Sequence, residues 1–429
     1  MILKFKNLLK PGESLSQKVV RSTFWVAAFK VTERILRFVR TIILARLLAP
    51  SDFGLFGLAL LSMSILSTFT QTGVGTAMIQ KKGKTEGFLD TAWTINVIRG
   101  GALAFLLFFF APTVAQFFNN SSVTNFARII GIIFLCNGFQ NIGVIYFRKE
   151  LDFRKQFIFQ FSKVSVEVIV SLTLAFILRN AWALVWGYLA GGIASCIVSY
   201  IIHPYRPRLY LDLPRAKELL NFGKWIFGSS ILVFLITQGD DILVGKVLGL
   251  TALGLYQMAY AISNLPATEI THVISQVTFP AYSKLQDNLP KLREAYLKVL
   301  QLTAFVSFPI AGLIFALAPD FTRLFLGEKW MPMVPAMQIL VIGGAIRSIG
   351  ATIGPIFQGI GRPDILTKSM FAQLLILAVS IYPLIFKLGI TGASIAVVIP
   401  GLIVNTFLFC RINMIIKNKL RVSLTKISY

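Results

Sequence analysis

Residues 44–49 of the chain read Leu-Ala-Arg-Leu-Leu-Ala, and residues 244–249, 200 positions later, read Val-Gly-Lys-Val-Leu-Gly. Aliphatic, small and basic positions coincide in the two stretches. A second match, between residues 142–146 and residues 353–357, is offset by 211 positions, as if the second half carried a short insertion. Both copies lie in strongly apolar sequence. An internal duplication of this kind predicts a membrane transporter whose site lies between two halves.

The composition agrees with a membrane protein. Hydrophobic residues make up 55% of the 429 residues and charged residues only 14%. Apolar runs of about 20 residues, the length that crosses a bilayer as a helix, recur along the chain. The formal net charge of +24 would indicate nucleic-acid binding in a soluble protein. Here most of the basic residues fall in predicted loops, which is typical of the cytoplasmic loops of membrane proteins. We expect no nucleic-acid partner.

The fold class that we predict is all-α, a polytopic membrane protein of about twelve transmembrane helices. Six crossings per half return the chain to the side it left, so the two six-helix lobes should be related as parallel repeats. The predicted helices cover residues 20–48, 54–79, 88–111, 124–146, 155–178, 182–203, 217–247, 254–282, 294–318, 333–359, 365–387 and 391–415.

The predicted domain organisation follows from these helices. Alternate loops are rich in Lys and Arg, so the positive-inside rule places these loops and both termini in the cytoplasm. The N-terminal segment interleaves Lys with Ile, Leu and Phe, which is typical of an amphipathic helix on the anionic lipids of the inner leaflet, and it lacks the features of a cleaved signal. The predicted parts are an amphipathic segment 1–19, an N-lobe 20–203, a Pro-rich cytoplasmic linker 204–216, a C-lobe 217–416 and a cytoplasmic tail 417–429.

The first predicted helix carries an unusual stripe of charge: Lys30, Glu33, Arg34, Arg37 and Arg40. At 100° per residue these side chains fall within an arc of about 120°. Each charge facing lipid near the helix centre would cost about 2.5–3.5 kcal/mol. One interpretation is a salt bridge between Glu33 and Arg37, which are four residues apart. That pairing leaves at least two cations without a partner on this helix, so the alternative is a stripe that lines a water-filled cavity.

Further cations lie inside predicted helices: Arg99, Arg128, Lys163 and Arg347. For each one alone, a functional role and a structural explanation by snorkelling or a local partner are equally good. Together with the stripe they indicate a cationic interior. A guanidinium group matches phosphate oxygens through forked hydrogen bonds, so we expect an anionic passenger with a phosphate or an acidic sugar.

Asp240 and Asp241 lie in the seventh predicted helix, at the repeat positions of Arg40 and Thr41. A carboxylate within a transporter helix is a candidate for coupling to H⁺ or Na⁺, because its occupancy can differ between two conformations. The alternative is a static ion pair with Arg37, Arg40 or Lys246.

Two more carboxylates, Glu33 and Glu269, are further candidates for ion coupling. Glu269 stands three residues from His272 on one predicted helix, where a polar pair that stabilises a kink is the alternative. The three cysteines have neither metal-ligand nor disulfide spacing. We expect no metal site and no cofactor other than the coupling ion.

Five stretches of the chain resemble the Wzx-type polysaccharide transporters, including O-antigen flippases and colanic-acid exporters of lipopolysaccharide biosynthesis, in the multidrug/oligosaccharidyl-lipid/polysaccharide flippase superfamily. The resemblance covers nearly the whole chain, and the motifs are specific when taken together. The stretches are residues 42–56, 90–100, 147–154, 240–256 and 361–364.

The resemblance implies two lobes of six helices that open alternately to the two sides of a bacterial inner membrane. It implies an undecaprenyl-pyrophosphate-linked oligosaccharide as substrate, for O-antigen, capsule or exopolysaccharide assembly, with the polysaccharide polymerase and chain-length machinery as partners. Some relatives have fourteen helices rather than twelve. On this basis Arg34 and Arg37, assisted by Lys30 and Arg40, would hold the pyrophosphate or an acidic sugar, and Asp240 or Asp241 would bind a cation on the return stroke.

Three other classes of protein were weighed against this hypothesis. A multidrug or metabolite antiporter of the same superfamily would share the fold, but cationic drugs favour an acidic interior. A lipid II-type flippase differs only in its glycan. A membrane enzyme would need a long periplasmic loop or a compact His/Asp/Glu site, and the sequence has neither. We expect no enzymatic activity.

Overall fold

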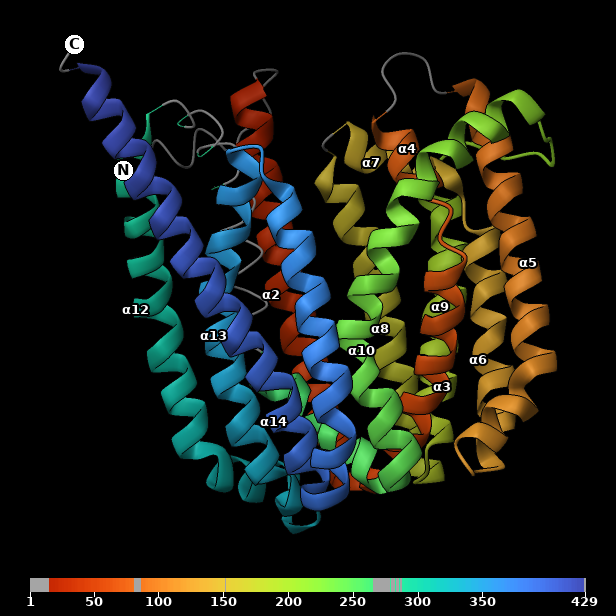
Figure 1. Cartoon of the computed structure of the whole chain (residues 1–429). Helices are drawn as coiled ribbons and strands as arrows, with labels where there is room; N and C mark the ends of the chain where they lie inside the picture. The colour runs from red at the N-terminus through yellow and green to blue at the C-terminus, as the bar shows by residue number, and fades with distance from the viewer. Residues whose placement is uncertain are drawn as a thin grey trace, which may run out of the picture. The chain divides into compact units, whose positions relative to one another are not determined.

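The computed structural model describes residues 15–80, 86–150, 152–264, 278, 282, 285 and 288–427. Every regular element within these residues is a helix (Figure 1). The elements in chain order are α2 (Leu15–Leu47), α3 (Pro50–Phe69), α4 (Val74–Gln80), α5 (Glu86–Phe117), α6 (Ser122–Phe139), η1 (Ile142–Val144), α7 (Ile145–Lys149), α8 (Phe153–Leu178), α9 (Trp182–Ile202), α10 (Leu213–Ser263), α12 (Leu289–Phe321), η2 (Thr322–Leu326), η3 (Glu328–Met333), α13 (Val334–Gly359) and α14 (Pro363–Ile427).

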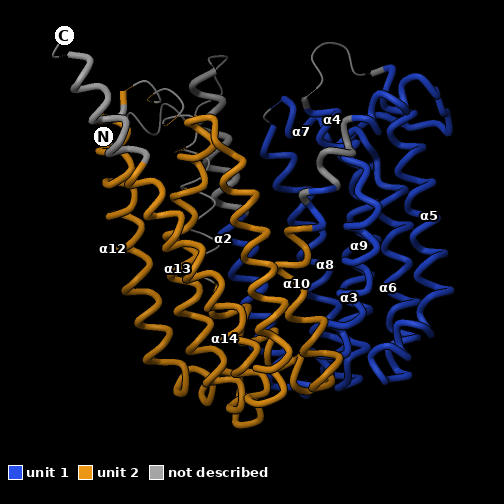
Figure 2. The backbone as a smooth tube through the Cα atoms, viewed as in Figure 1, with its two compact units in different colours: residues 1–231 blue, residues 232–429 orange. Residues whose placement is uncertain are grey.

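The chain forms two compact units, residues 1–231 and 232–429 (Figure 2). The division falls inside α10, beyond the Pro-rich segment 204–216 that we predicted as the linker. The amphipathic segment 1–19 lies, as far as residue 14, outside the described residues. The predicted tail from residue 417 continues α14 as far as Ile427. The lobe boundaries themselves stay predictions.

In the N-terminal unit, each of the long helices packs against the next in the order α5, α6, α9, α8 and α2, and α3 packs on α6 (Figure 1). Between α6 and α9 the core contains Ile130, Ile133, Val185 and Leu189, all buried. The helices are apolar on most faces, because both lipid and neighbouring helices favour apolar side chains. The burial of a core residue therefore depends on which helix lies beside it.

Gly187 sets how closely α9 approaches α8. A Cβ atom at this position would lie 2.5 Å from the Cβ of Ser171, closer than real Cβ atoms come. Gly191, four residues later, also lies close to α8, since a Cβ atom there would be 3.0 Å from the Glu167 Cβ. This spacing of two glycines is a common way for membrane helices to bring their backbones together. It places the α9 backbone directly against Glu167 and Ser171.

In the C-terminal unit, α12 packs on α13 and α13 packs on α14. Two glycines break the long helices. Gly249 (φ 82°) interrupts α10, and Gly389 (φ 60°) divides α14 into two helices. A positive φ is costly for residues with a Cβ atom and is readily adopted by glycine. Each glycine therefore reverses the chain where our sequence prediction placed the end of one helix and the start of the next.

Eight helical stretches of the described residues are long and apolar enough to cross a membrane. One of them, 363–414, contains two of the predicted helices, 365–387 and 391–415. The predicted helices 20–48, 217–247 and 254–282 are not among the eight. The first two are represented by α2 and α10, which carry the charged residues that lower their hydropathy. Part of 254–282 lies outside the described residues.

Two predicted helices were wrong in their extent. The helix predicted at 54–79 is divided between α3 and α4 by residues 70–73, where Gly73 has a φ of 65°. The helix predicted at 124–146 stops at Phe139. There the side chain of Asn141 accepts a hydrogen bond from the backbone N of Gly143 (2.9 Å) and starts a separate short turn. Apolar sequence continues across both breaks, so hydropathy alone does not show them.

Residues 203–212 join α9 to α10 and are held against the start of α5. Asp90 accepts hydrogen bonds from the Tyr205 hydroxyl (2.5 Å) and the Arg208 backbone N (2.7 Å). Burial and the bond to Asp90 raise the pKa of Tyr205. The hydroxyls of Thr94 and Thr91 accept from backbone N atoms further along the same segment. The motif at 90–96 is thus an anchor for the connecting segment.

Candidate functional site

The charged stripe of the first predicted helix lies on α2, and its partner is Glu167 of α8. Glu167 is 2% exposed, and its Oε1 atom lies 2.6 Å from Nη1 of Arg40 and 3.4 Å from Nη1 of Arg37. The Nε atom of Arg40 also donates to the Ser171 hydroxyl (2.9 Å). The predicted bridge between Glu33 and Arg37 is confirmed, at 3.0 Å. We call Glu33, Arg37, Arg40, Glu167 and Ser171 the α2/α8 cluster.

The members of this cluster differ in how accessible they are. The Arg37 side chain is 40% exposed, whereas that of Arg40 is 10% exposed. Arg37 can therefore reach a ligand while it contacts Glu167, but the guanidinium of Arg40 is surrounded by protein. Lys30 is exposed and Arg34 is half-buried on the same helix. The Oε2 atom of Glu167 is buried and has no hydrogen-bond partner within the described part of the chain.

Glu167 was missed by the sequence analysis. It stands in the apolar segment predicted at 155–178, one turn after Lys163, so an isolated carboxylate in a membrane helix was the available signal. Lys163 itself lies 5.9 Å from the centre of the Tyr188 ring, a cation–π distance. Tyr188 belongs to α9, which places Lys163 at the α8/α9 contact beside the cluster.

The other two predicted cations of the N-terminal unit bind α3 and α5. Arg99 donates to the backbone oxygens of Thr70 (2.8 Å) and Ser67 (2.9 Å), the last carbonyls of α3. Arg128 donates to the Phe108 carbonyl (3.3 Å) and lies 4.7 Å from the centre of that ring. These contacts satisfy helix carbonyls and support structural roles for both arginines.

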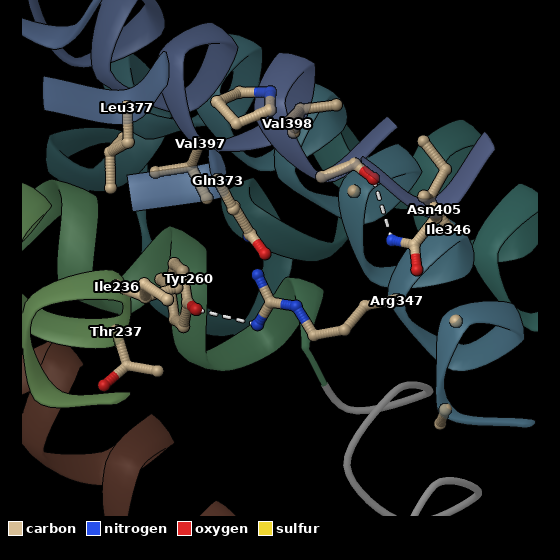
Figure 3. A pocket seen from close by; sticks show the side chains of 15 residues that line it. Ile236, Thr237, Tyr260, Ile346, Arg347, Gln373, Leu377, Val397, Val398 and Asn405 are labelled. Carbon is tan, nitrogen blue, oxygen red and sulfur yellow. Dashed lines mark hydrogen bonds between the residues drawn. The ribbon is translucent and has the colours of Figure 1, made fainter. Parts of the chain in front are cut away.

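In the C-terminal unit, Arg347 of α13 points into a cavity of about 310 Å³ (Figure 3). Its Nη1 atom donates to the Tyr260 hydroxyl (2.8 Å) and to Oδ1 of Asn264 (3.0 Å). Gln373 extends toward the guanidinium from the far wall in Figure 3, and Asn405 lies at one side. The hydrogen-bond partners of Arg347 are neutral, and its positive charge also acts on the nearby carboxylate of Asp240. This cavity suits an anionic or sugar hydroxyl group.

Asp240 and Asp241 lie on α10, and two tyrosines connect Asp240 to Arg347 in this cavity. Asp240 is buried and accepts from the Tyr256 hydroxyl (2.6 Å), and Asp241 accepts from Nε2 of Gln257 (3.2 Å). The reversal at Gly249 brings these partners back to face the two carboxylates. The Tyr256 ring lies 6.2 Å from that of Tyr260, the residue that Arg347 contacts. Glu269 lies outside the described residues.

A family model described as "Polysaccharide biosynthesis protein" matches residues 43–335. The lipopolysaccharide biosynthesis protein WzxC of Escherichia coli (strain K12) is 27% identical over 357 residues, which cover 83% of this chain and 73% of that protein. The teichuronic acid biosynthesis protein TuaB of Bacillus subtilis (strain 168) is 25% identical over 372 residues, covering 82% of this chain and 73% of TuaB.

Two solved structures have the same fold. The lipid II flippase MurJ in an inward closed conformation has a TM-score of 0.74 at 16% identity, over 90% of this chain and 87% of that one. An inward-facing multidrug resistance MATE transporter of the MOP superfamily has a TM-score of 0.69 at 18% identity, over 91% and 96%. The chain is therefore an all-helical, multi-pass membrane protein. Since the family model covers most of it, the chain belongs to the polysaccharide biosynthesis family of Wzx-like flippases, which are transporters and not enzymes.

Proposed function

We propose that the protein moves undecaprenyl-pyrophosphate-linked oligosaccharide repeat units from the cytoplasmic to the periplasmic leaflet by alternating access, for O-antigen, capsule or exopolysaccharide assembly. Membership in the polysaccharide biosynthesis family supports a glycan substrate. The observation that carries the proposal is Arg347, an arginine on a membrane helix whose side chain enters a cavity with neutral partners. Such a group binds phosphate or acidic sugar oxygens.

We propose that the α2/α8 cluster forms a binding surface within the N-terminal unit. Arg37 is the member exposed enough to contact a phosphate, with Arg34 and Lys30 on the same helix. Glu167 and Ser171 hold Arg40, which we propose fixes the position of Glu167 and through it that of Arg37. Lys163 completes the basic surface. For Arg99 and Arg128, a contact with substrate stays a prediction.

We propose that Asp240 and Asp241 couple transport to H⁺ or Na⁺. The Oδ1 atom of Asp240 is buried and has no hydrogen-bond partner among the described residues, while Oδ2 accepts from Tyr256. A buried carboxylate oxygen without a donor costs free energy that a bound cation offsets. Release of the cation in one conformation would then favour the other.

The test of this function is complementation in a bacterium that lacks its own exopolysaccharide flippase. The measured quantities are surface polymer and accumulated lipid-linked repeat units, at equal protein level, for the wild type, Arg37→Ala and Arg323→Ala. Arg323 pairs with Glu328 (2.8 Å) in an exposed position and serves as the matched control. We expect the wild type and Arg323→Ala to restore polymer, and Arg37→Ala to leave repeat units accumulated.

Three results would contradict the proposal. Normal polymer with Arg37→Ala would remove the α2/α8 cluster from the substrate path. Cation-dependent drug efflux in place of polymer would assign the chain to the multidrug antiporters of the superfamily. Restored growth of a strain depleted of its lipid II flippase, without polymer, would assign it a peptidoglycan precursor.

A further inference from the structure

A second cavity, of about 540 Å³, lies between the two helices of α14. Its lining includes Lys368 from the first turns of the first helix and Arg411 from the second helix. Ile376 and Ile403 line it further along the same two helices. The two helices are therefore antiparallel here, with both cations at one end of the cavity and both isoleucines at the other. We call this cavity the α14 pocket.

The basic end of the pocket carries an excess of positive charge. Arg362 is engaged by Asp364, with Nε 3.0 Å from Oδ1 and Nη2 3.3 Å from Oδ2. Asp364 is the one carboxylate among the lining residues and faces three cations, Arg362, Lys368 and Arg411, so the pocket keeps an excess of positive charge. The Arg411 guanidinium lies 5.5 Å from the centre of the Phe407 ring, which holds it at the mouth of the pocket.

The opposite end of the pocket is apolar and open. Ile403 is 49% exposed, and the stretch 363–414 has the highest mean hydropathy of the eight candidate spans, 2.1. Along each helix, eight residues separate the cation from the isoleucine, a rise of about 12 Å. The headgroup layer of a bilayer is about 5–8 Å thick on each side, so this rise is long enough to reach from headgroup phosphate into hydrocarbon. The pocket therefore has the polarity profile of a phospholipid.

We propose that the α14 pocket binds an anionic phospholipid of the bilayer. The phosphate lies between Lys368 and Arg411, and an acyl chain lies along Ile376, Ile403 and Phe407. Two observations support this proposal. Three cations and one carboxylate lie at one end of the pocket, and the isoleucines of its apolar wall lie about 12 Å further along the helices. Cations that served only topology would need no cavity beside them and would not discriminate between lipids.

The experiment is native mass spectrometry of the full chain purified in detergent and mixed with phosphatidylglycerol or phosphatidylcholine. One variant removes charge, Lys368→Gln with Arg411→Gln. A second fills the pocket and keeps its charge, Ala372→Trp. The matched control, Lys291→Gln with Arg293→Gln, removes two exposed basic residues from the start of α12.

We expect the wild type and the control to bind phosphatidylglycerol alike, and both pocket variants to bind it about tenfold more weakly. Binding of phosphatidylcholine should be weaker and unaffected by the variants. The thermal unfolding midpoint of each variant in detergent checks that it is folded, and Ala372→Trp keeps the test decisive if the double charge variant is not.

Three outcomes would overturn the proposal. Equal losses in the pocket and control variants would mean that the lipid senses only the surface charge. Displacement of the lipid by glycerol 3-phosphate at the same concentration would mean a site for free phosphate. Displacement by undecaprenyl phosphate at a lower concentration than by phosphatidylglycerol would assign the pocket to the polyprenyl carrier.

Discussion

The two units hold their membrane-embedded charges in different ways. In the α2/α8 cluster, arginine meets carboxylate: Arg40 and Arg37 share the buried Oε1 atom of Glu167. In the C-terminal unit, the hydrogen-bond partners of the charged groups are neutral. Arg347 donates to a tyrosine and an asparagine, Asp240 accepts from a tyrosine, and the charge of Arg347 acts on Asp240 without a direct bond. A cation in direct contact with a carboxylate contributes little net charge to its surroundings, whereas a cation without that contact keeps more of it.

This difference determines whether removal of a charged side chain lowers the stability of the fold or the binding of a ligand. A buried ion pair is destabilised strongly when one partner is removed, because the other charge is left in a medium that does not solvate it. A cation that opens into a cavity can be removed at little cost to folding, but an anionic ligand loses its partner. Substitutions in the α2/α8 cluster should therefore lower stability most, and substitution of Arg347 should lower transport with little effect on stability.

The largest effect on stability is expected for Glu167→Ala. This change leaves Arg37 and Arg40 beside an emptied buried site, and the loss of one partner of a buried pair costs about 3–5 kcal/mol. The Arg40 contact is the shortest ion pair of the cluster, at 2.6 Å. The thermal unfolding midpoint in detergent should fall clearly below that of the wild type.

Glu167→Gln is the matched variant, because it keeps the shape and the hydrogen-bond acceptor and removes only the charge. It should lower the midpoint less than Glu167→Ala. Wild-type stability in Glu167→Ala would show that the α2/α8 contacts do not stabilise the N-terminal unit. It would contradict the statement that the ion pairs of this unit have a structural role.

A smaller loss is expected for Tyr256→Phe. The hydroxyl of Tyr256 is the donor to Oδ2 of the buried Asp240, whose Oδ1 has no hydrogen-bond partner among the described residues. Leaving a buried acceptor without its donor costs about 1–3 kcal/mol. The double variant Asp240→Ala with Tyr256→Phe removes both partners and should be more stable than the sum of the single changes indicates. Additive losses would show that the two groups do not interact.

The sequence predicted which charged residues lie in membrane helices better than it predicted which residues they contact. The charged stripe of α2, the pair Asp240–Asp241 and Arg347 all followed from charge placed in apolar helices. The bridge between Glu33 and Arg37 followed from a four-residue spacing, which is a property of a single helix. The contact between Arg40 and Glu167 joins residues 127 positions apart, and no local pattern specifies which helices lie side by side.

The same limit applies to the fold. The turns at Gly249 and Gly389 were placed because a loop was needed between two long apolar segments. The breaks at residues 70–73 and 140–141 were missed, because apolar sequence continues through them. Polar contacts stabilise both breaks in the folded chain. The Asn141 side chain accepts from the Gly143 backbone, and Arg99 donates to carbonyls at the end of α3.

The smallest effect on stability is expected for Arg347→Gln, together with a loss of transport. Arg347 is exposed to the cavity, its hydrogen bonds are with the neutral groups of Tyr260 and Asn264, and the carboxylate of Asp240 on which its charge acts keeps its hydrogen bond from Tyr256 after the change. Substitutions at such positions change the free energy of unfolding by about 0.5 kcal/mol or less. Surface polymer, measured in the complementation strain, should nevertheless fall to the background level at unchanged protein level.

Arg347→Lys sharpens this test, because lysine keeps the positive charge and lacks the planar fork that binds two oxygens of a phosphate. If the cavity needs only charge, lysine restores polymer. If it needs the forked contact, lysine fails as glutamine does, with wild-type thermal stability in both. A clear loss of thermal stability in Arg347→Gln would contradict the comparison directly. It would show that Arg347 stabilises the fold as Arg40 does, and it would remove the reason for proposing that its charge binds a ligand.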